Sequence, residues 1–228
     1  MDDLGVETGY GRWAASYDDG DNPLIRLEHD CLAMLRWGAP QRVLDVATGT
    51  GRHALAFGLE GADVLGLDAS GQMLAVAEAK RARHGLSNVR FARAPIDAPL
   101  PVQATAFDLA ICALALCHVQ RLSEAVAFIA AAVRPGGHVV LTDLHPVAVS
   151  EGLVTLFEED GQTHAIRTVA HTLEAYVGAL ASSGMEVVAV EERTLGDGLT
   201  TRPTNLPPGV RADWESLPFC LVVHGRKP

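Results

Sequence analysis

Residues 43–55, VLDVATGTGRHAL, decide the fold, because they join an apolar, β-branched run to a helical pattern through a glycine turn. The run before the turn is typical of a buried strand, and the pattern after it predicts a short helix. Gly49 and Gly51 allow the backbone to turn tightly and a ligand to approach it closely. Asp45 places a carboxylate inside the apolar run. We therefore expect a strand, a turn that can hold a ligand, and a helix.

Strand-like and helix-like segments alternate beyond this stretch. Strands are predicted over 42–48, 62–68, 88–94, 107–116 and 138–144, and helices over 52–61, 70–85 and 122–133. Ser70 is a good N-cap for the second of these helices, and Gly61 and Gly85 are typical of helix ends. Repeated strand–helix units with apolar strands indicate a parallel sheet that is covered by helices on both faces.

The pattern changes after residue 146. Alternating residues around Asp160 and Gly161 predict a hairpin over 154–169. A helix over 171–184 and strands over 185–194 and 219–228 are expected to follow. A long Pro/Gly-rich loop that contains Trp214 separates these last two strands, and loops of that length are usually functional.

Composition excludes several classes of partner. The chain has 228 residues, a formal net charge of -10 and no basic stripe, so neither nucleic acid nor an anionic membrane surface is expected to bind. No apolar run is long enough to cross a membrane, and the first residues lack the features of a secretory signal. The cysteines form no C-x-x-C pair, which favours free thiols in a cytoplasmic protein and argues against a metal site. They are Cys31, Cys112, Cys117 and Cys220.

Asp68 ends the second predicted strand, about 20 residues after the glycine turn, where an acid can accept hydrogen bonds from both hydroxyls of a ribose. Ligands of open α/β sheets bind outside the carboxyl ends of the strands. The two features together predict a ligand with an adenosine-like ribose. A structural interpretation stays open for both acids, with Asp68 as a helix cap and Asp45 as a satisfied core carboxylate.

A nicotinamide-dependent oxidoreductase is an alternative, because Gly49-x-Gly51-x-x-Ala54 also fits a dinucleotide fingerprint. Asp45 argues against it, since its carboxylate would repel a pyrophosphate but could hold an ammonium group. The chain also lacks the Tyr/Lys pair of a dehydrogenase centre, because Tyr176 is followed four residues later by Leu180.

Six segments occur in order between residues 10 and 146: YGRWAASYD, VLDVATGTG, VLGLDASGQML, VRFARAPIDAPLP, FDLAICALALCHV and VRPGGHVVLTDLHP. Together they resemble the class I S-adenosylmethionine-dependent methyltransferases, especially the small-molecule enzymes of the ubiquinone/menaquinone-methyltransferase-like group. The resemblance implies an α/β, Rossmann-like fold with a seven-stranded, mostly parallel sheet, helices on both faces and an antiparallel last strand. It implies one domain over 1–228, with an N-terminal helical lid (1–40), a cofactor-binding core (41–146) and a substrate-side part with a hairpin insertion and the terminal strands (147–228).

The resemblance also implies S-adenosylmethionine as the cofactor and S-adenosylhomocysteine as its product. The loop 47–51 would pass under the methionine part, Asp45 would help hold its amino group, and Asp68 would bind the ribose. The implied cofactor-binding residues are Trp13, Tyr17, Asp45, Ala47, Thr48, Gly49, Gly51, Asp68, Ala69, Met73, Ala94, Pro95, Ile96, Ala113, Leu114 and His118.

Adenine recognition departs from the family pattern. Pro95 stands where the family often has an acid that accepts from the adenine amino group. Two routes stay open: Asp97 performs this task through a shifted loop, or the backbone over 94–96 reads the adenine.

Methyl transfer to a hydroxyl or an amine is helped by a base, for which histidine is the natural candidate. His145 and His118 follow strands at the edge where an acceptor should lie, and Asp143 could orient His145. His164 and His171 fall in the region of the hairpin, and a structural interpretation stays open for every histidine.

The expected acceptor is a small molecule that is methylated on oxygen or nitrogen. Its pocket would lie between the N-terminal lid, the hairpin and the loop near Trp214. A composition rich in Ala, Gly and Arg fits a role in bacterial specialised metabolism. A homodimer, and a methyltransferase-like scaffold with a non-methylating or binding role, are left open.

Overall fold

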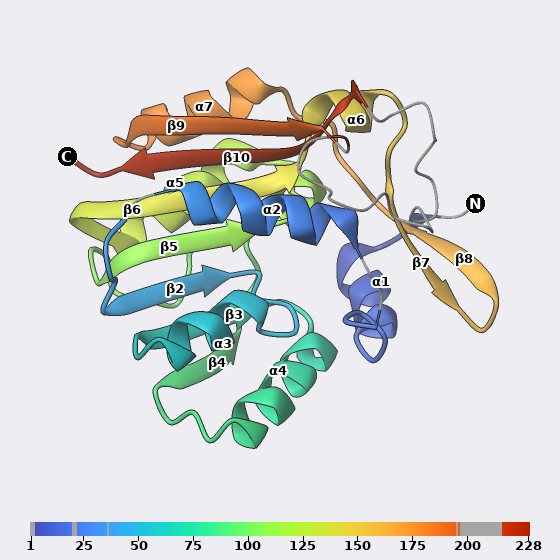
Figure 1. Cartoon of the computed structure of the whole chain (residues 1–228), viewed down its shortest axis with the longest axis horizontal. Coiled ribbons are helices and arrows are strands. Elements are labelled where there is room, and N and C mark those ends of the chain that lie inside the picture. The colour runs from blue at the N-terminus through green and yellow to red at the C-terminus, as the bar shows by residue number, and fades with distance from the viewer. Residues whose placement is uncertain (1–2, 20–21, 36, 195, 197–215) are drawn as a thin grey trace.

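The computed structural model describes residues 3–19, 22–35, 37–194, 196 and 216–228. The loop near Trp214 therefore lies outside the described residues. Figure 1 shows a central sheet whose parallel strands all point toward the end of the molecule where α1 (Val6–Trp13) lies. Helices cover both sides of this sheet.

The main sheet confirms the predicted seven-stranded, mostly parallel fold. Its four parallel pairings join β4 (Val89–Arg93), β3 (Asp63–Asp68), β2 (Arg42–Val46), β5 (Phe107–Ala113) and β6 (Val133–Leu144). β10 (Pro218–Arg226) pairs antiparallel with β6 and with the edge strand β9 (Glu186–Thr194). Strand order reverses between β2 and β5, which is where ligands bind in open α/β sheets.

Two apolar layers hold the helices on the sheet. On one face, α2 (Pro23–Met34) and α3 (Arg52–Leu59) bury Leu27, Cys31 and Ala54, and α4 (Gly71–Arg83) packs beside α3. On the other face, α5 (Leu122–Ala132) and α7 (Leu173–Ser182) bury Ile129 and Leu180. Figure 1 shows α2 in front of the sheet. Among the described residues of 1–40, the segment from Gly5 through α1 and the turn after it lies at the carboxyl edge, whereas the apolar side of α2 is part of the core.

A second, three-stranded sheet lies beside α1. It consists of β1 (Asp3–Leu4), β8 (Gln162–Ile166) and β7 (Thr155–Glu159). Asp160 and Gly161 have positive φ angles of 51° and 72°, the backbone that a two-residue turn between twisted strands requires. The parallel pairing of β1 with β8 ties the N-terminal segment to the hairpin.

Two of the differences from the predicted element ends have a clear physical reason. The helix predicted over 122–133 ends at Ala132, and the RPGG segment lies inside β6 as an irregular start of the strand. A Cβ on Gly137 would lie 2.7 Å from the carbonyl oxygen of Asp108, so only glycine allows this close approach. The strand predicted over 107–116 ends at Ala113, because Leu114 has a φ of 55° and a 3-10 turn, η1 (Leu116–His118), follows.

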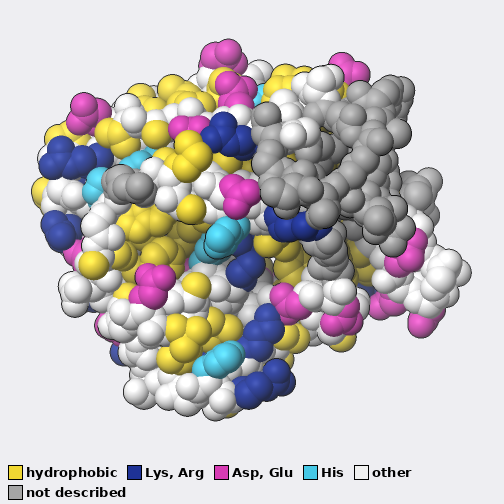
Figure 2. All heavy atoms as spheres, viewed as in Figure 1, with side chains coloured by type: hydrophobic (Ala, Val, Ile, Leu, Met, Phe, Trp, Pro, Cys, Tyr) yellow, Lys and Arg dark blue, Asp and Glu magenta, His cyan; other side chains and the backbone are white. Residues whose placement is uncertain are grey.

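The surface carries charges of both signs. Figure 2 shows basic and acidic side chains spread between apolar ones on the visible face. Within the described ranges, none of the helices combines the length and apolar character that a bilayer crossing requires.

Candidate functional site

A cavity of about 560 Å³ opens at the carboxyl ends of β2, β3 and β5, between these strands and α1. Its volume is in the range of small-molecule and cofactor sites. Most of the predicted cofactor residues line it, namely Tyr17, Ala47, Gly49, Asp68, Ala69, Met73, Ala94, Pro95, Ile96, Ala113, Leu114 and His118. The structure therefore brings predicted residues from five separate segments of the chain to one hollow.

The loops at the ends of β2 and β5 have unusual backbone conformations. Ala47 and Leu114 line the cavity. Their φ angles are 58° and 55°, a backbone conformation that residues other than glycine rarely adopt. Gly49 (φ 55°) and Gly51 (φ 85°) follow in the glycine turn. Strained backbone of this kind gathers at functional sites, and here it occurs on the two strands that flank the reversal of strand order.

Asp45 lies beneath the glycine turn and does not line the cavity. Its Oδ2 accepts hydrogen bonds from the Thr48 hydroxyl (2.6 Å) and the Ala54 amide (3.0 Å). Its Oδ1 is buried and has no hydrogen-bond partner among the described residues. Burial raises the pKa of this carboxyl, which these hydrogen bonds partly oppose. Asp45 and Thr48 thus stabilise the turn from its buried side, and Oδ1 of Asp45 is still able to accept a hydrogen bond.

Asp68 joins the glycine turn to the end of β3. Its Oδ2 accepts from the Gly49 amide and its Oδ1 from the Ser70 amide, each at 2.8 Å. Burial raises the pKa of the carboxyl, while the two amides favour its charged form. Each carboxylate oxygen can accept a further hydrogen bond, and the side chain lines the cavity.

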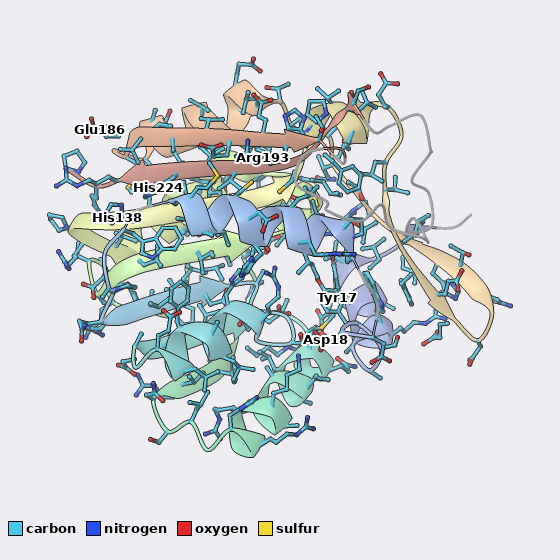
Figure 3. All side chains as sticks on the ribbon, in the orientation of Figure 1. Tyr17, Asp18, His138, Glu186, Arg193 and His224 are labelled. Carbon is cyan, nitrogen blue, oxygen red and sulfur yellow. The ribbon has the colours of Figure 1, made fainter. Side chains whose placement is uncertain are left out.

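Aromatic side chains of α1 and the following turn close one wall of the cavity. Tyr17 lines the large cavity, whereas Trp13 lines an adjoining hollow of about 80 Å³ that shares Tyr10, Tyr17 and Leu114 with it. Trp13 stacks on Phe157 of β7, with ring centroids 5.5 Å apart. Figure 3 shows Tyr17 and Asp18 at the end of α1 that faces α4.

The far end of the cavity is lined by both groups that the sequence offered for adenine recognition. Ala94, Pro95 and Ile96 form part of the wall, and so does Asp97. Both routes to adenine recognition therefore stay predictions.

His118 is held in one tautomer by its neighbours. Its Nδ1 lies 2.7 Å from the carbonyl oxygen of Arg167, which can only accept, so Nδ1 carries the proton. The Tyr10 hydroxyl then donates to Nε2 at 2.8 Å. Burial lowers the pKa of His118 and raises that of Tyr10. The pair is therefore a neutral imidazole and a protonated phenol at neutral pH.

Asp143 fixes the turn that carries His118. It is fully buried and accepts from the Cys117 amide (2.6 Å), the Tyr176 hydroxyl (2.8 Å) and the Leu144 amide (2.8 Å). From the sequence, Asp143 was a candidate for orienting His145. The structure uses it to anchor η1 to β6.

His145 does not line the cavity. Its Nδ1 accepts from the Val147 amide at the start of α6 (Pro146–Ser150), and its Nε2 donates to Glu192 of β9 at 2.7 Å. One ring nitrogen thus caps α6, and the other donates a hydrogen bond to Glu192. The geometry gives no support to His145 as the base.

The remaining histidines of interest also have structural partners. His171 bonds the Val119 carbonyl at 2.7 Å, and His164 lies 3.1 Å from Arg12. His138 and His224 share a hydrogen bond of 2.8 Å at the end of the sheet opposite α1 (Figure 3). Among the described residues, no group of three or more His, Cys, Asp or Glu side chains could hold a metal ion.

The comparisons with known proteins agree with this geometry. A family model described as a methyltransferase domain matches residues 43–137, from β2 to the start of β6. The malonyl-[acyl-carrier protein] O-methyltransferase of Pseudescherichia vulneris is 32% identical over 178 residues, which cover 76% of this chain and 68% of that protein. The chain belongs to the S-adenosylmethionine-dependent methyltransferase family.

Other methyltransferases match over different lengths. An uncharacterized methyltransferase of Bacillus subtilis, YcgJ, is 33% identical over 105 residues, which span 46% of this chain but only 41% of that protein. A solved S-adenosylmethionine-dependent methyltransferase of Mesorhizobium loti is 27% identical, with a TM-score of 0.69 over 92% of this chain and 99% of that one. The cofactor of the family is S-adenosylmethionine.

Tyr10, Arg167 and Glu7 are among the residues of this methyltransferase pocket that no sequence pattern marked as functional candidates. Tyr10 precedes His118 by 108 positions, so no local pattern joins them. Tyr10 opens the segment YGRWAASYD, which contributed to the family resemblance but assigned no role to this residue.

Proposed function

We propose that this chain transfers a methyl group from S-adenosylmethionine to an oxygen or nitrogen atom of a small molecule, with His118 receiving the proton of the acceptor. The single observation that carries the proposal is the neutral, oriented His118–Tyr10 pair in the same cavity as Asp68 and the glycine turn. A cofactor site and a candidate base thus share one hollow.

The residues present fit the cofactor. Asp68 keeps acceptor capacity on both oxygens for a pair of ribose hydroxyls. The buried, unpaired Oδ1 of Asp45 fits a water or an amino group near the glycine turn. Met73 and Ile96 add apolar surface where the purine would lie.

When bound, S-adenosylmethionine supplies a methyl group on a positively charged sulfur that leaves as a neutral thioether. The leaving group needs no acid, so the protein has to orient the acceptor, exclude water and take up a proton. The wall contributed by α1 and the turn after it helps to exclude water. It consists of the aromatic side chains of Tyr10, Trp13 and Tyr17.

Proton uptake follows from the tautomer of His118. An acceptor hydroxyl that bonds the Tyr10 oxygen can pass its proton to Tyr10 while the Tyr10 proton moves to Nε2 of His118. Tyr10 is then unchanged, and His118 becomes positively charged. The lowered pKa of His118 keeps it neutral and ready before the reaction, and the Arg167 carbonyl holds the ring in place.

The acceptor class is the remaining part of the proposal. The hollow of about 80 Å³ beside the main cavity is lined by Trp13, Leu144, Leu153 and Phe219, which favour an apolar part on the acceptor. A bacterial specialised-metabolism setting, a homodimer and the exclusion of nucleic acid stay predictions.

The experiment has two steps. Calorimetric titration with S-adenosylmethionine, S-adenosylhomocysteine and NADPH should detect only the first two, and binding of NADPH alone would favour the oxidoreductase alternative. Methyl transfer should then be measured over a panel of small phenols, hydroxy acids and amines. His118→Gln should lower turnover by about 10²–10⁴-fold, the usual contribution of a general base, which is far more than it lowers the affinity for S-adenosylhomocysteine. Cofactor binding without methyl transfer to any compound would favour the non-methylating scaffold.

A further inference from the structure

Arg167 holds an unusual position at the rim of the cavity. Its backbone is fixed twice, because its amide donates to the Leu4 carbonyl (3.3 Å) and its carbonyl accepts from His118 (2.7 Å). Its side chain is exposed and lines the cavity. Within the described part of the chain, its guanidinium makes neither an ion pair nor a hydrogen bond.

The other two arginines close to the cavity differ in this respect. Arg93 pairs with Glu7 of α1 and donates to the Ala69 carbonyl at 2.8 Å. Arg121, which also lines the cavity, pairs with Glu124 at 2.9 Å. Of these three arginines, Arg167 is therefore the one whose guanidinium N–H groups are available to bind a ligand.

A guanidinium binds a carboxylate through two parallel hydrogen bonds, which fixes the orientation of the bound molecule as well as its position. Three acids line the cavity, and none of them forms an ion pair with Arg167 among the described residues. Glu7 pairs with Arg93, and Asp68 binds the amides of Gly49 and Ser70. Asp97 is the third. An anionic group of a ligand can thus reach the guanidinium beside the candidate base.

We propose that Arg167 binds a carboxylate of the methyl acceptor, so that the substrates are small hydroxy or amino compounds that carry one carboxylate. This inference rests on the proposed function and names its substrate class. The guanidinium places the carboxylate on one side of His118, and Tyr10 reaches the nucleophile on the other.

Substrate binding at Arg167 also strengthens the base. The groups that act on the pKa of His118 are its own burial, which lowers it, the Arg167 carbonyl and Asp143, which raise it, and the Arg167 charge, which lowers it. Tyr10 donates to the same ring. A carboxylate on Arg167 neutralises the nearby positive charge, so the pKa of His118 rises when the acceptor is bound.

S-adenosylmethionine has a carboxylate of its own, and this second source must be separated from the acceptor. The test compares wild type, Arg167→Gln and the matched control Arg121→Gln, in which a paired cavity arginine is lost. Calorimetry with S-adenosylhomocysteine and with 5′-methylthioadenosine, which lacks the amino-acid part, measures the cofactor side. Arg167→Gln should leave both affinities unchanged. A selective loss of S-adenosylhomocysteine binding would assign Arg167 to the cofactor and overturn the proposal.

The acceptor side uses the complex with S-adenosylhomocysteine and two pairs of probes, acetate with acetamide and 4-hydroxybenzoate with 4-hydroxybenzamide. Carboxylates should bind wild type and Arg121→Gln better than their amides by about tenfold or more, the scale of one charge-assisted hydrogen bond, and Arg167→Gln should abolish this preference. The His118 pKa, followed by NMR, should rise on carboxylate binding in wild type and in Arg121→Gln, but not in Arg167→Gln. Equal binding of acids and amides to wild type, or an unmoved His118, would overturn the inference. Failure of S-adenosylhomocysteine to bind wild type would instead reject the proposed function.

Discussion

The carboxylate of Asp68, at the end of β3, accepts a hydrogen bond of 2.8 Å from the backbone amide of Gly49, in the turn after β2. One side chain thus supports the glycine turn and lines the cavity beside it. A change at Asp68 is therefore expected to affect both the conformation of the glycine turn and ligand binding in the cavity.

Replacing Asp68 with Ala should weaken S-adenosylhomocysteine binding by about 1.5–3 kcal/mol, because hydrogen bonds to a charged acceptor are lost. Calorimetry measures the change. Asp63→Ala, at the opposite end of β3 in an exposed pair with Arg90, is the matched control and should bind normally. An unchanged affinity in Asp68→Ala would mean that the ribose lies elsewhere.

Substitutions at Gly51 and Gly61 distinguish two destabilising effects of an added side chain, namely backbone strain at a positive φ angle and steric crowding. Both have positive φ angles, 85° and 96°, but a Cβ on Gly51 would lie 3.1 Å from both Ala77 and Phe91, whereas a Cβ on Gly61 would meet nothing within 4 Å. Gly61→Ala should lose about 1–2 kcal/mol of unfolding free energy from backbone strain alone. Gly51→Ala should lose about 1–3 kcal/mol more through overpacking, as measured by urea denaturation. Equal losses would contradict the crowding argument.

Asp18 connects the turn after α1 to the cofactor half. It accepts from the Thr50 hydroxyl at 2.9 Å and pairs with Lys80 of α4 at 2.5 Å. Asp18→Asn should cost at most about 1 kcal/mol of stability, since exposed pairs contribute little, but should speed dissociation of S-adenosylhomocysteine in stopped-flow experiments. Wild type should show the same acceleration at high salt. The hypothesis fails if Asp63→Asn, which breaks a remote exposed pair, gives an equal acceleration.

The His138–His224 pair should make stability depend on pH. Burial and the neighbouring His138 lower the pKa of His224 from 6.5 to about 4. Between these values the unfolded chain binds a proton that the folded chain does not, so this contribution is full above pH 6.5 and is lost as pH falls toward 4. Urea midpoints at pH 7.5, 6 and 5 should fall less steeply in His224→Gln, which keeps a hydrogen-bonding group without the titration. Parallel slopes in both proteins would contradict this assignment.

Much of the cofactor half of the site could be predicted because its parts are local. Glycine turns, the Ser70 cap and the acids at the ends of β2 and β3 are recognisable within a few residues of sequence. The Ser70 hydroxyl does accept from the Met73 amide, as its position before an apolar helix predicts. The placement of Asp45 beneath the turn was not predictable, because it depends on the Thr48 and Ala54 donors that fold back over it.

The two histidine candidates show the limit of sequence reasoning. His118 and His145 both follow strands of the main sheet, so their positions in the sequence do not show which of them is the better candidate base. Glu192 and the start of α6 engage His145, whereas Tyr10 and Arg167 orient His118 toward the cavity. These partners come from segments that no local pattern relates.

The sequence by itself determined the order of strands and helices, the parallel sheet and the glycine turn with its nearby acids, because side-chain periodicity and turn chemistry act between close neighbours in the chain. Only the tertiary structure decided that β1 joins the hairpin, that α2 covers the sheet, and that Tyr10, His118 and Arg167 meet in one cavity. Such contacts depend on how distant segments pack together, and a distance of 2.8 Å between Tyr10 and His118 is set by that packing alone.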